Sequence, residues 1–186
     1  MEILTKTELR KRLTEILEKI KGGAVFIHPT DTIYGIGCHA LDRKAVREVR
    51  KLKQQQQPFS VWIPSLNWAR ENCVLSHEGI KWLKKLPGPY TIIVQLRRRA
   101  VAEETNLGGD TLGIRQPDHW FGKVVEKLNI PIVTTSANRT GQPFMTSLEN
   151  LDEEIKKGID FMIYEGEKKG RPSKIVNLVE RTVRER

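Results

Sequence analysis

The sequence has few of the residues that build cross-linked or membrane-spanning proteins. Its only cysteines, Cys38 and Cys73, lie far apart, and no histidine pair accompanies them at zinc-ligand spacing. This argues against a disulfide framework and against a metal site held by the protein. No apolar run approaches ~20 residues, and the first residues lack a basic stretch that leads into an apolar one. We therefore expect a cytoplasmic protein that neither spans nor is targeted to a membrane.

The common nucleotide-binding fingerprints are also absent. Neither G-x-x-x-x-G-K-[ST] nor G-x-G-x-x-G occurs, and residues 35–37 are only a fragment of the second pattern. The four histidines share no ligand spacing, and no nucleophile with an adjacent base can be nominated from spacing. Spacing alone therefore identifies no chemistry.

What the chain does have is an even spread of apolar residues and an excess of positive charge. Hydrophobic residues make up 38% of its 186 residues, which suits a single domain over residues 1–186. The 32 Lys and Arg against 23 Asp and Glu leave a net charge of +9, so the surface should attract polyanions such as nucleotides or nucleic acid. A solvated basic surface without a partner explains the same charge equally well.

Helical and strand-like segments alternate along the chain. Helical spacing of apolar residues predicts helices over residues 7–20, 43–53, 76–85, 120–128 and 147–157, the first capped by Thr7 and the last by Ser147. Short apolar runs bounded by Gly or Pro predict strands over residues 24–27, 59–63, 90–96, 112–115, 131–135, 161–164 and 175–179. Residues 97–111 and 165–172 are expected to be loops. The predicted fold class is α/β, with a twisted open sheet and flanking helices.

Five polar clusters directly follow apolar runs, which is where loops at one end of a sheet converge on a ligand. Each has a structural alternative. A loop such as residues 30–37 is often only a turn, and Lys53 can end its helix for dipole reasons. Arg115 lies among apolar strand residues and needs an anionic partner, which is either a bound phosphate or carboxylate or a salt bridge to Asp118 or Asp110.

The phrase His28-Pro29-Thr30-Asp31-Thr32-Ile33-Tyr34-Gly35-Ile36-Gly37 resembles the opening signature of the YrdC family. Four further phrases follow in the family's order: a Lys-ended helix before Pro-Phe-Ser, then residues 86–91, 112–119 and 134–141. The resemblance covers about residues 5–180. It implies the YrdC-like α/β fold, built on an open mixed sheet.

The resemblance also implies an activity. Members of the family are nucleotidyltransferases that join L-threonine, bicarbonate and ATP into L-threonylcarbamoyl-AMP and pyrophosphate, with Mg²⁺ arriving on the ATP. This is the first step of the threonylcarbamoyl-adenosine modification of tRNA, and a threonylcarbamoyl-transferase complex acts downstream.

Site residues are carried over from matching motif positions. The resemblance gives Lys53 and Arg115 the catalytic roles, Lys53 at the phosphates and Arg115 at a carboxylate or phosphate. The residues that it implies for substrate binding are Thr30, Thr32, Tyr34, Trp62, Ser136, Asn138, Ser173 and Lys174.

The chain departs from the family pattern at three positions. Gln55 stands where the Arg of Lys-x-Arg belongs, Trp62 replaces a smaller or imidazole side chain, and Lys174 replaces the usual Thr. The YciO-like branch of the family also lacks the full Lys-x-Arg pattern. A second hypothesis is therefore a non-catalytic protein that binds nucleotides, tRNA or double-stranded RNA through basic stretches such as residues 97–99 and 168–171.

Overall fold

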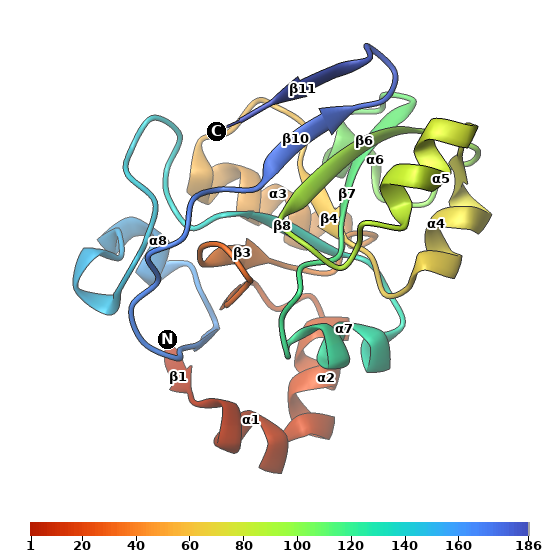
Figure 1. Ribbon diagram of the computed structural model, residues 1–186. Coiled ribbons are helices and arrows are strands. Elements are labelled where there is room, and N and C mark those ends of the chain that lie inside the picture. The colour runs from red at the N-terminus through yellow and green to blue at the C-terminus, as the bar shows by residue number, and fades with distance from the viewer. Residues whose placement is uncertain (186) are drawn as a thin grey trace.

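The computed structural model describes residues 1–185, and within them eleven short strands carry the architecture (Figure 1). The strands are β1 Glu2–Leu4, β2 Phe26–His28, β3 Gly35–Gly37, β4 Ser60–Trp62, β5 Cys73–Val74, β6 Tyr90–Leu96, β7 Thr111–Arg115, β8 Ile132–Ser136, β9 Phe161–Ile163, β10 Lys174–Asn177 and β11 Thr182–Arg184.

Short helices flank these strands. They are α1 Lys6–Lys11, α2 Leu13–Lys21, α3 Arg43–Lys53, α4 Leu66–Asn72, α5 His77–Leu83, α6 Glu103–Asn106, α7 Gly122–Leu128, α8 Glu153–Lys157 and the 3₁₀ helix η1 Leu148–Asn150.

The strands form one mixed sheet. Their order is β1-β9-β2-β3-β8-β4-β7-β6-β10-β11, with β5 paired to β6. The pairs β1/β9, β2/β9, β4/β7 and β6/β10 are parallel, and the pairs that join β3 to β2 and β8 are antiparallel. The sheet is open, with β1 and β11 at its edges. The predicted α/β class with a mixed open sheet is confirmed.

The first predicted helix, residues 7–20, is wrong in its limits. Thr5 rather than Thr7 caps it, because the Glu8 carboxylate accepts from the Thr5 backbone N–H at 2.8 Å while the Thr5 hydroxyl accepts from the Glu8 N–H. The helix ends at Arg12, and α2 continues the chain in a new direction.

The last predicted helix, residues 147–157, is also divided. Ser147 precedes only the 3₁₀ helix η1, and α8 begins after Asp152, whose carboxylate accepts from two backbone N–H groups of the first turn. Six elements were not predicted: β1, β3, β5, β11, α4 and α6, the last inside the expected loop of residues 97–111. Most of them are strands of two or three residues, which gain their hydrogen bonds from distant segments.

One face of the sheet is apolar throughout. Side chains of alternate strand residues, among them Val61, Ile114 and Val133, pack there against α3, α4, α5 and α8. The opposite face is apolar only at one end, where Phe26 and Trp62 pack against α1, α2 and α7. Figure 1 shows these three helices together below the sheet. The remainder of that face is uncovered by helices, and the polar clusters of the sequence fall there.

The glycines of β3 shape this second face. Strand register places Gly35 beside His28 and Gly37 beside Phe26. A Cβ atom at Gly35 would lie 2.9 Å from His28 Cε1, and one at Gly37 would lie 2.9 Å from His28 Cδ2 and 3.0 Å from Phe26 Cζ. The imidazole therefore lies flat over β3, stacked on Phe121 with 5.4 Å between ring centroids.

Replacing Gly37 by Ala should destabilise the protein. The added methyl meets two buried rings and the Val133 carbonyl oxygen, so we expect the free energy of unfolding to fall by about 1–3 kcal/mol in urea titrations. Gly122→Ala is the matched control, because its methyl meets only Trp62 at 3.6 Å and Ala favours the helix. Equal effects of the two substitutions would contradict the close packing of His28 on β3.

Candidate functional site

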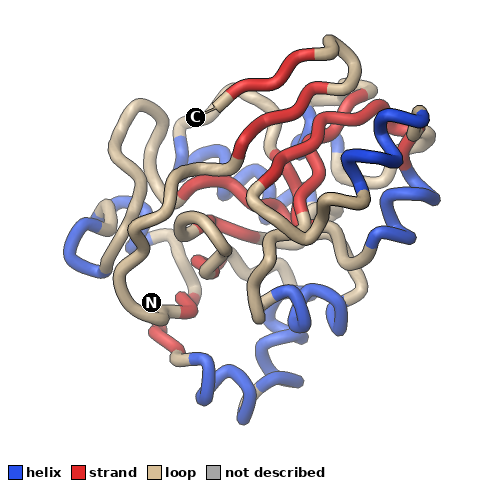
Figure 2. The backbone as a smooth tube through the Cα atoms, in the orientation of Figure 1, coloured by secondary structure: helices blue, strands red, loops and turns tan. Residues whose placement is uncertain are grey.

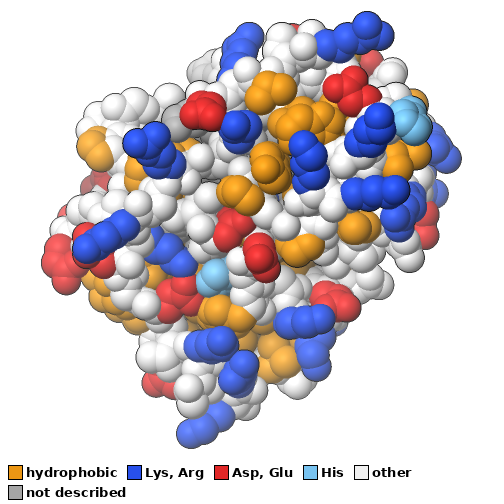
Figure 3. All heavy atoms as spheres, in the orientation of Figure 1, with side chains coloured by type: hydrophobic (Ala, Val, Ile, Leu, Met, Phe, Trp, Pro, Cys, Tyr) orange, Lys and Arg blue, Asp and Glu red, His pale blue; other side chains and the backbone are white. Residues whose placement is uncertain are grey.

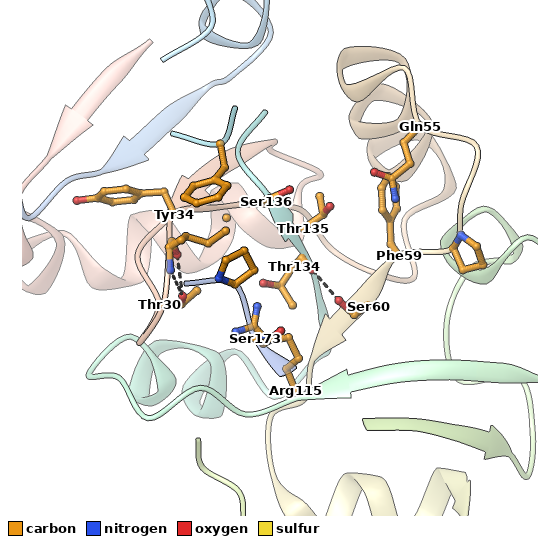
Figure 4. Close-up of a pocket in the computed structure, with 15 residues that line it drawn as sticks. Thr30, Tyr34, Gln55, Phe59, Ser60, Arg115, Thr134, Thr135, Ser136 and Ser173 are labelled. Atoms are coloured by element: carbon orange, nitrogen blue, oxygen red, sulfur yellow. Dashed lines mark hydrogen bonds between the residues drawn. The ribbon is translucent and has the colours of Figure 1, made fainter. Parts of the chain in front are cut away.

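A cavity of about 230 Å³ opens on the polar end of the second face. Five of the predicted site residues line it: Thr30, Tyr34, Arg115, Ser136 and Ser173. They come from four separate segments of the chain, and Figure 4 shows them around a common space. Loops distant in sequence thus meet where the motifs predicted.

The loop after β2 presents Thr30 and Tyr34. The Thr30 hydroxyl accepts from the backbone N–H groups of Thr32 and Ile33 at 3.0 and 3.2 Å and donates to the Ile33 carbonyl at 2.7 Å. These bonds fix the turn without help from other segments. The Tyr34 hydroxyl donates to the Gly166 carbonyl at 2.7 Å, and burial raises the pKa of Tyr34 to about 12.

Arg115 ends β7 with only 6% of its surface exposed. Its guanidinium lies 3.7 Å from Asp31 Oδ1 and donates to the Thr32 hydroxyl at 3.3 Å. An ion pair with Asp31 thus forms, a residue that the sequence analysis did not consider as the partner. Because both charges are largely withdrawn from water, each depends on the other, and a ligand anion placed here meets a guanidinium already held in position.

Lys53 lies behind the cavity wall. Its ammonium is buried and donates to the carbonyl oxygens of Ser136 and Asn138, both at 2.6 Å. The Asn138 side chain in turn accepts from the Ser136 hydroxyl. Lys53 and Asn138 therefore hold the loop that carries Ser136 and do not line the cavity themselves.

A second hollow, of about 390 Å³, adjoins the first, and Pro172 lines both. Thr32, Asp31, Arg171 and Lys174 also line the second one. Lys174 pairs there with Glu185 at 2.8 Å. Of the predicted substrate contacts, Thr32 and Lys174 thus belong to this neighbouring hollow.

Trp62, which was predicted to contact the substrate, lines neither hollow. Its side chain is fully buried and packs edge-on against Phe121 and His28, with ring centroids 5.6 and 5.7 Å apart. Ser60 and Trp62 share one face of β4, but only Ser60 lines the cavity, because Trp62 is covered by Phe121 and His28 further along the strand.

Residues 165–173, called the strap here, run across the site between β9 and β10 (Figure 2). Lys168 donates to the Thr30 carbonyl at 2.8 Å, and a Cβ atom at Gly170 would lie 2.2 Å from the Thr32 carbonyl oxygen. The strap therefore rests on the loop of residues 30–34 backbone against backbone.

Glu165 fastens the start of the strap. Its carboxylate contacts His119 Nε2 at 2.9 Å and accepts from Trp120 Nε1 at 2.6 Å. Burial alone would raise the pKa of Glu165, but hydrogen bonds from Lys168, Trp120 and His119 bring it below its ordinary value. The carboxylate is thus charged at neutral pH and ties the strap to the turn before α7.

Five further cavity residues were not among the predicted site residues, although three of them lie in segments that the sequence had singled out, Thr134, Thr135 and Gln55; the other two are Ser60 and Phe59. The signal was present for two of them, because Thr134 shares a strand face with Ser136, and Ser60 pairs with Thr134 across β4 and β8. Arg50 organises the outer rim by donating to the carbonyls of Gln55 and Gln57. No sequence pattern announces that contact.

Metal-binding side chains do not cluster in the part of the chain that the structure describes. Residues 1–185 contain no group of three His, Cys, Asp or Glu side chains that could hold a metal ion. Over the same range, no helix is long and apolar enough to cross a membrane.

The family model for Sua5, YciO and YrdC proteins, described as telomere recombination, matches residues 18–185. The chain belongs to this family. A Methanocaldococcus jannaschii protein with a provisional threonylcarbamoyl-AMP synthase name is 35% identical over 177 residues, which are 92% of this chain and 83% of the relative. A threonylcarbamoyl-AMP synthase of Pyrococcus abyssi is 32% identical over 168 residues, 87% of this chain and 49% of the relative.

Solved structures of the family share the fold. Pyrococcus abyssi Sua5 in complex with L-threonine superposes with a TM-score of 0.85 at 26% identity, over 98% of this chain and 55% of that one. Escherichia coli YciO superposes with a TM-score of 0.82 at 20% identity, over 95% and 89%. The chain thus spans about half the length of the Pyrococcus relatives and most of YciO.

Tyr34→Phe should loosen the strap. The change removes the hydrogen bond to the Gly166 carbonyl and the one from the Glu165 N–H, so we expect the free energy of unfolding to fall by about 1–2 kcal/mol and proteolysis within residues 165–173 to accelerate. Tyr164→Phe is the control, because Tyr164 stacks on Tyr34 at 5.6 Å with no hydroxyl hydrogen bond found among residues 1–185. If Tyr34→Phe and Tyr164→Phe have the same free energy of unfolding and the same rate of proteolysis, the Tyr34 hydroxyl does not anchor the strap.

Proposed function

We propose that this protein makes L-threonylcarbamoyl-AMP from L-threonine, bicarbonate and ATP. The observation that carries the proposal is the cavity itself, which is lined by Thr30, Thr134 and Ser136 together with the buried Arg115. Hydroxyls and one fixed cation suit a polar, anionic ligand. The relatives named as synthases support the same activity.

The reaction makes modest demands on the protein. The threonine amine and bicarbonate give a carbamate with loss of water, a carbamate oxygen then attacks the α-phosphorus, and the bond to pyrophosphate breaks. Because no covalent enzyme intermediate is needed, positioning and charge stabilisation supply most of the catalysis. In this assignment Arg115 binds the substrate carboxylate or the α-phosphate, and the Ser136 loop contacts the nucleotide.

The roles of Lys53 and Asn138 are supporting ones in this proposal. Lys53 donates to two carbonyls of the Ser136 loop, so it fixes the wall against which the nucleotide lies. Ser173, whose hydroxyl lies 2.7 Å from that of Thr91, closes the cavity from the start of β10.

Mg²⁺ enters this account with ATP. The ion keeps several waters and is usually bound through substrate phosphates and one or two carboxylates. Asp31, the carboxylate beside Arg115, is held in an ion pair with that guanidinium, so the ion would be bound mainly through the phosphates of ATP. The metal would neutralise phosphate charge, while Arg115 and the Ser136 loop orient the reacting groups.

The proposal is tested by pyrophosphate release. Purified protein with Mg²⁺, ATP and bicarbonate should release pyrophosphate only when L-threonine is added. Ser136→Ala should lower kcat/KM by roughly tenfold or more, because a hydroxyl contact with the nucleotide is lost together with the hydrogen bond to Asn138 that holds the loop. Ser147→Ala, at the start of η1, is the control and should leave the rate unchanged. If no amino acid stimulates pyrophosphate release under conditions where a relative with the full Lys-x-Arg pattern is active, the synthase assignment is refuted.

Gln55 offers a gain-of-function test. It lines the cavity mouth at the position of the family's Arg, so Gln55→Arg adds a guanidinium beside the ligand. We expect the Kd for ATP to fall by roughly tenfold, which corresponds to one charge-assisted hydrogen bond. Gln56→Arg places the same charge one residue away, outside the cavity lining, and should leave the Kd within twofold. An equal fall in the Kd for ATP in Gln55→Arg and Gln56→Arg would indicate a general electrostatic attraction of ATP and would contradict a specific contact at position 55.

A second candidate function, binding of RNA without catalysis, is favoured by one observation. Arg97, Arg98 and Arg99 line a separate hollow of about 230 Å³ at the end of β6. On the face drawn in Figure 3, however, Lys and Arg side chains are interspersed with Asp and Glu and do not form one continuous patch. An affinity for RNA that falls steeply with salt would support this function, and a flat response would contradict it.

A further inference from the structure

The hollow lined by Arg97, Arg98 and Arg99, called the arginine hollow here, takes no part in the proposed reaction. Its volume of about 230 Å³ equals that of the cavity around Arg115, and it lies where β6 ends. Tyr90, the first residue of β6, lines the hollow beside that cavity. Because a strand rises about 3.4 Å per residue, the two ends of β6 are roughly 20 Å apart. The arginine hollow is therefore separate from the proposed active site.

A buried asparagine fixes the wall that carries the arginines. Asn72 is 6% exposed, and its side chain donates to the Trp68 carbonyl at 2.8 Å. The Asn72 side-chain oxygen accepts from Arg98 Nε at 2.9 Å, and the Asn72 backbone carbonyl accepts from the Arg97 N–H at 2.8 Å. Arg98 uses only its Nε in this contact, so the terminal nitrogens of its guanidinium keep their donors for another partner.

A second buried asparagine fixes the other wall of the hollow. Asn106 donates to the carbonyl oxygens of Gly109 and Thr111 at 2.7 and 3.1 Å. The Asp110 carbonyl accepts from the Leu96 N–H at 2.7 Å, which joins this loop to the end of β6. Both walls are thus held in place by the protein itself, which is the preorganisation that a binding site needs.

The chain leaves most of the positive charge of this hollow without a close counter-charge. Arg99 lies 3.8 Å from a Glu103 carboxylate oxygen, and within residues 1–185 neither Arg97 nor Arg98 forms an ion pair. Other arginines on the surface are paired, because Arg43 and Arg47 share the Glu104 carboxylate at 2.9 and 2.6 Å. Neighbouring like charges repel, so an anion that enters the arginine hollow is attracted and relieves that repulsion.

The chemistry of the hollow favours a small phosphate-bearing anion. A guanidinium presents its N–H donors as a fork that matches two oxygens of one phosphate group. Two carboxylates limit the length of the ligand: Asp110 lines the hollow, and Glu103 lies beside Arg99. They would repel a polyanion that continued past the arginines. A short anion therefore fits the charges around the hollow better than an RNA strand does.

We propose that the arginine hollow binds a small phosphate-bearing anion of the size of inorganic diphosphate. Arg97 and Arg98 supply the donors, and Asn72 holds both of them in position. The inference goes beyond the synthase function and does not depend on it, because no residue that lines this hollow also lines the cavity or the hollow next to it.

The experiment is a titration of nitrogen-15-labelled protein with sodium pyrophosphate, followed by NMR at constant ionic strength. Amide signals of residues 97–99 and 108–110 should shift to saturation with a Kd below about 1 mM, whatever the signals of the cavity residues 134–136 do. Arg98→Gln should raise this Kd by roughly tenfold, the value of one charge-assisted hydrogen bond. Arg98→Lys keeps the charge but loses the fork, and should raise the Kd by roughly threefold or more.

Arg70→Gln is the matched control. It removes the same charge from α4, where the exposed Arg70 side chain donates to Asn67 and lies outside the hollow, so the Kd should stay within twofold. Absence of saturable shifts at residues 97–99 and 108–110 would overturn the inference, as would an equal loss of affinity in Arg98→Gln and Arg70→Gln. Shifts of the same signals with single-stranded oligouridylate but not with pyrophosphate would also overturn it and would assign the hollow to RNA.

Discussion

The absence of side chains on one face of β3 is the constraint on which this site depends. Gly35 and Gly37 leave room for His28 and Phe26 to lie across the strand, and this closes the aromatic layer beneath the cavity. A larger residue at either position would lift the imidazole away from the sheet and fill the space beside Thr134. The cavity is thus open because one central strand contributes only backbone.

Charge pairing is the second requirement. Arg115 is nearly buried, and Asp31 and Thr32 hold its guanidinium from the loop that precedes β3. The strap rests on the same loop through Lys168 and Gly170. Binding of an anion at Arg115 and the position of the strap are therefore mechanically linked, because both depend on residues 30–34.

The sequence predicted the class of the fold, and four of the five polar segments that it singled out line one cavity, because apolar periodicity and family phrases are local signals. It missed the role of Lys53, since only the folded chain shows that two backbone carbonyls of the Ser136 loop surround its ammonium. It also misplaced Trp62, which depends on the packing of α7 against β4. The short strand β1 was missed because its partner, β9, lies far away in the sequence.

The central claim is that ATP and an amino acid occupy the cavity framed by Thr30, Arg115, Thr134 and Ser136. A crystal structure of the protein with a non-hydrolysable ATP analogue and L-threonine tests this most directly. We predict that the threonine carboxylate or the α-phosphate contacts Arg115, with the nucleotide against the Ser136 loop. Ligands bound elsewhere, for example in the hollow of Arg97, Arg98 and Arg99, with the cavity holding only solvent, would contradict the account.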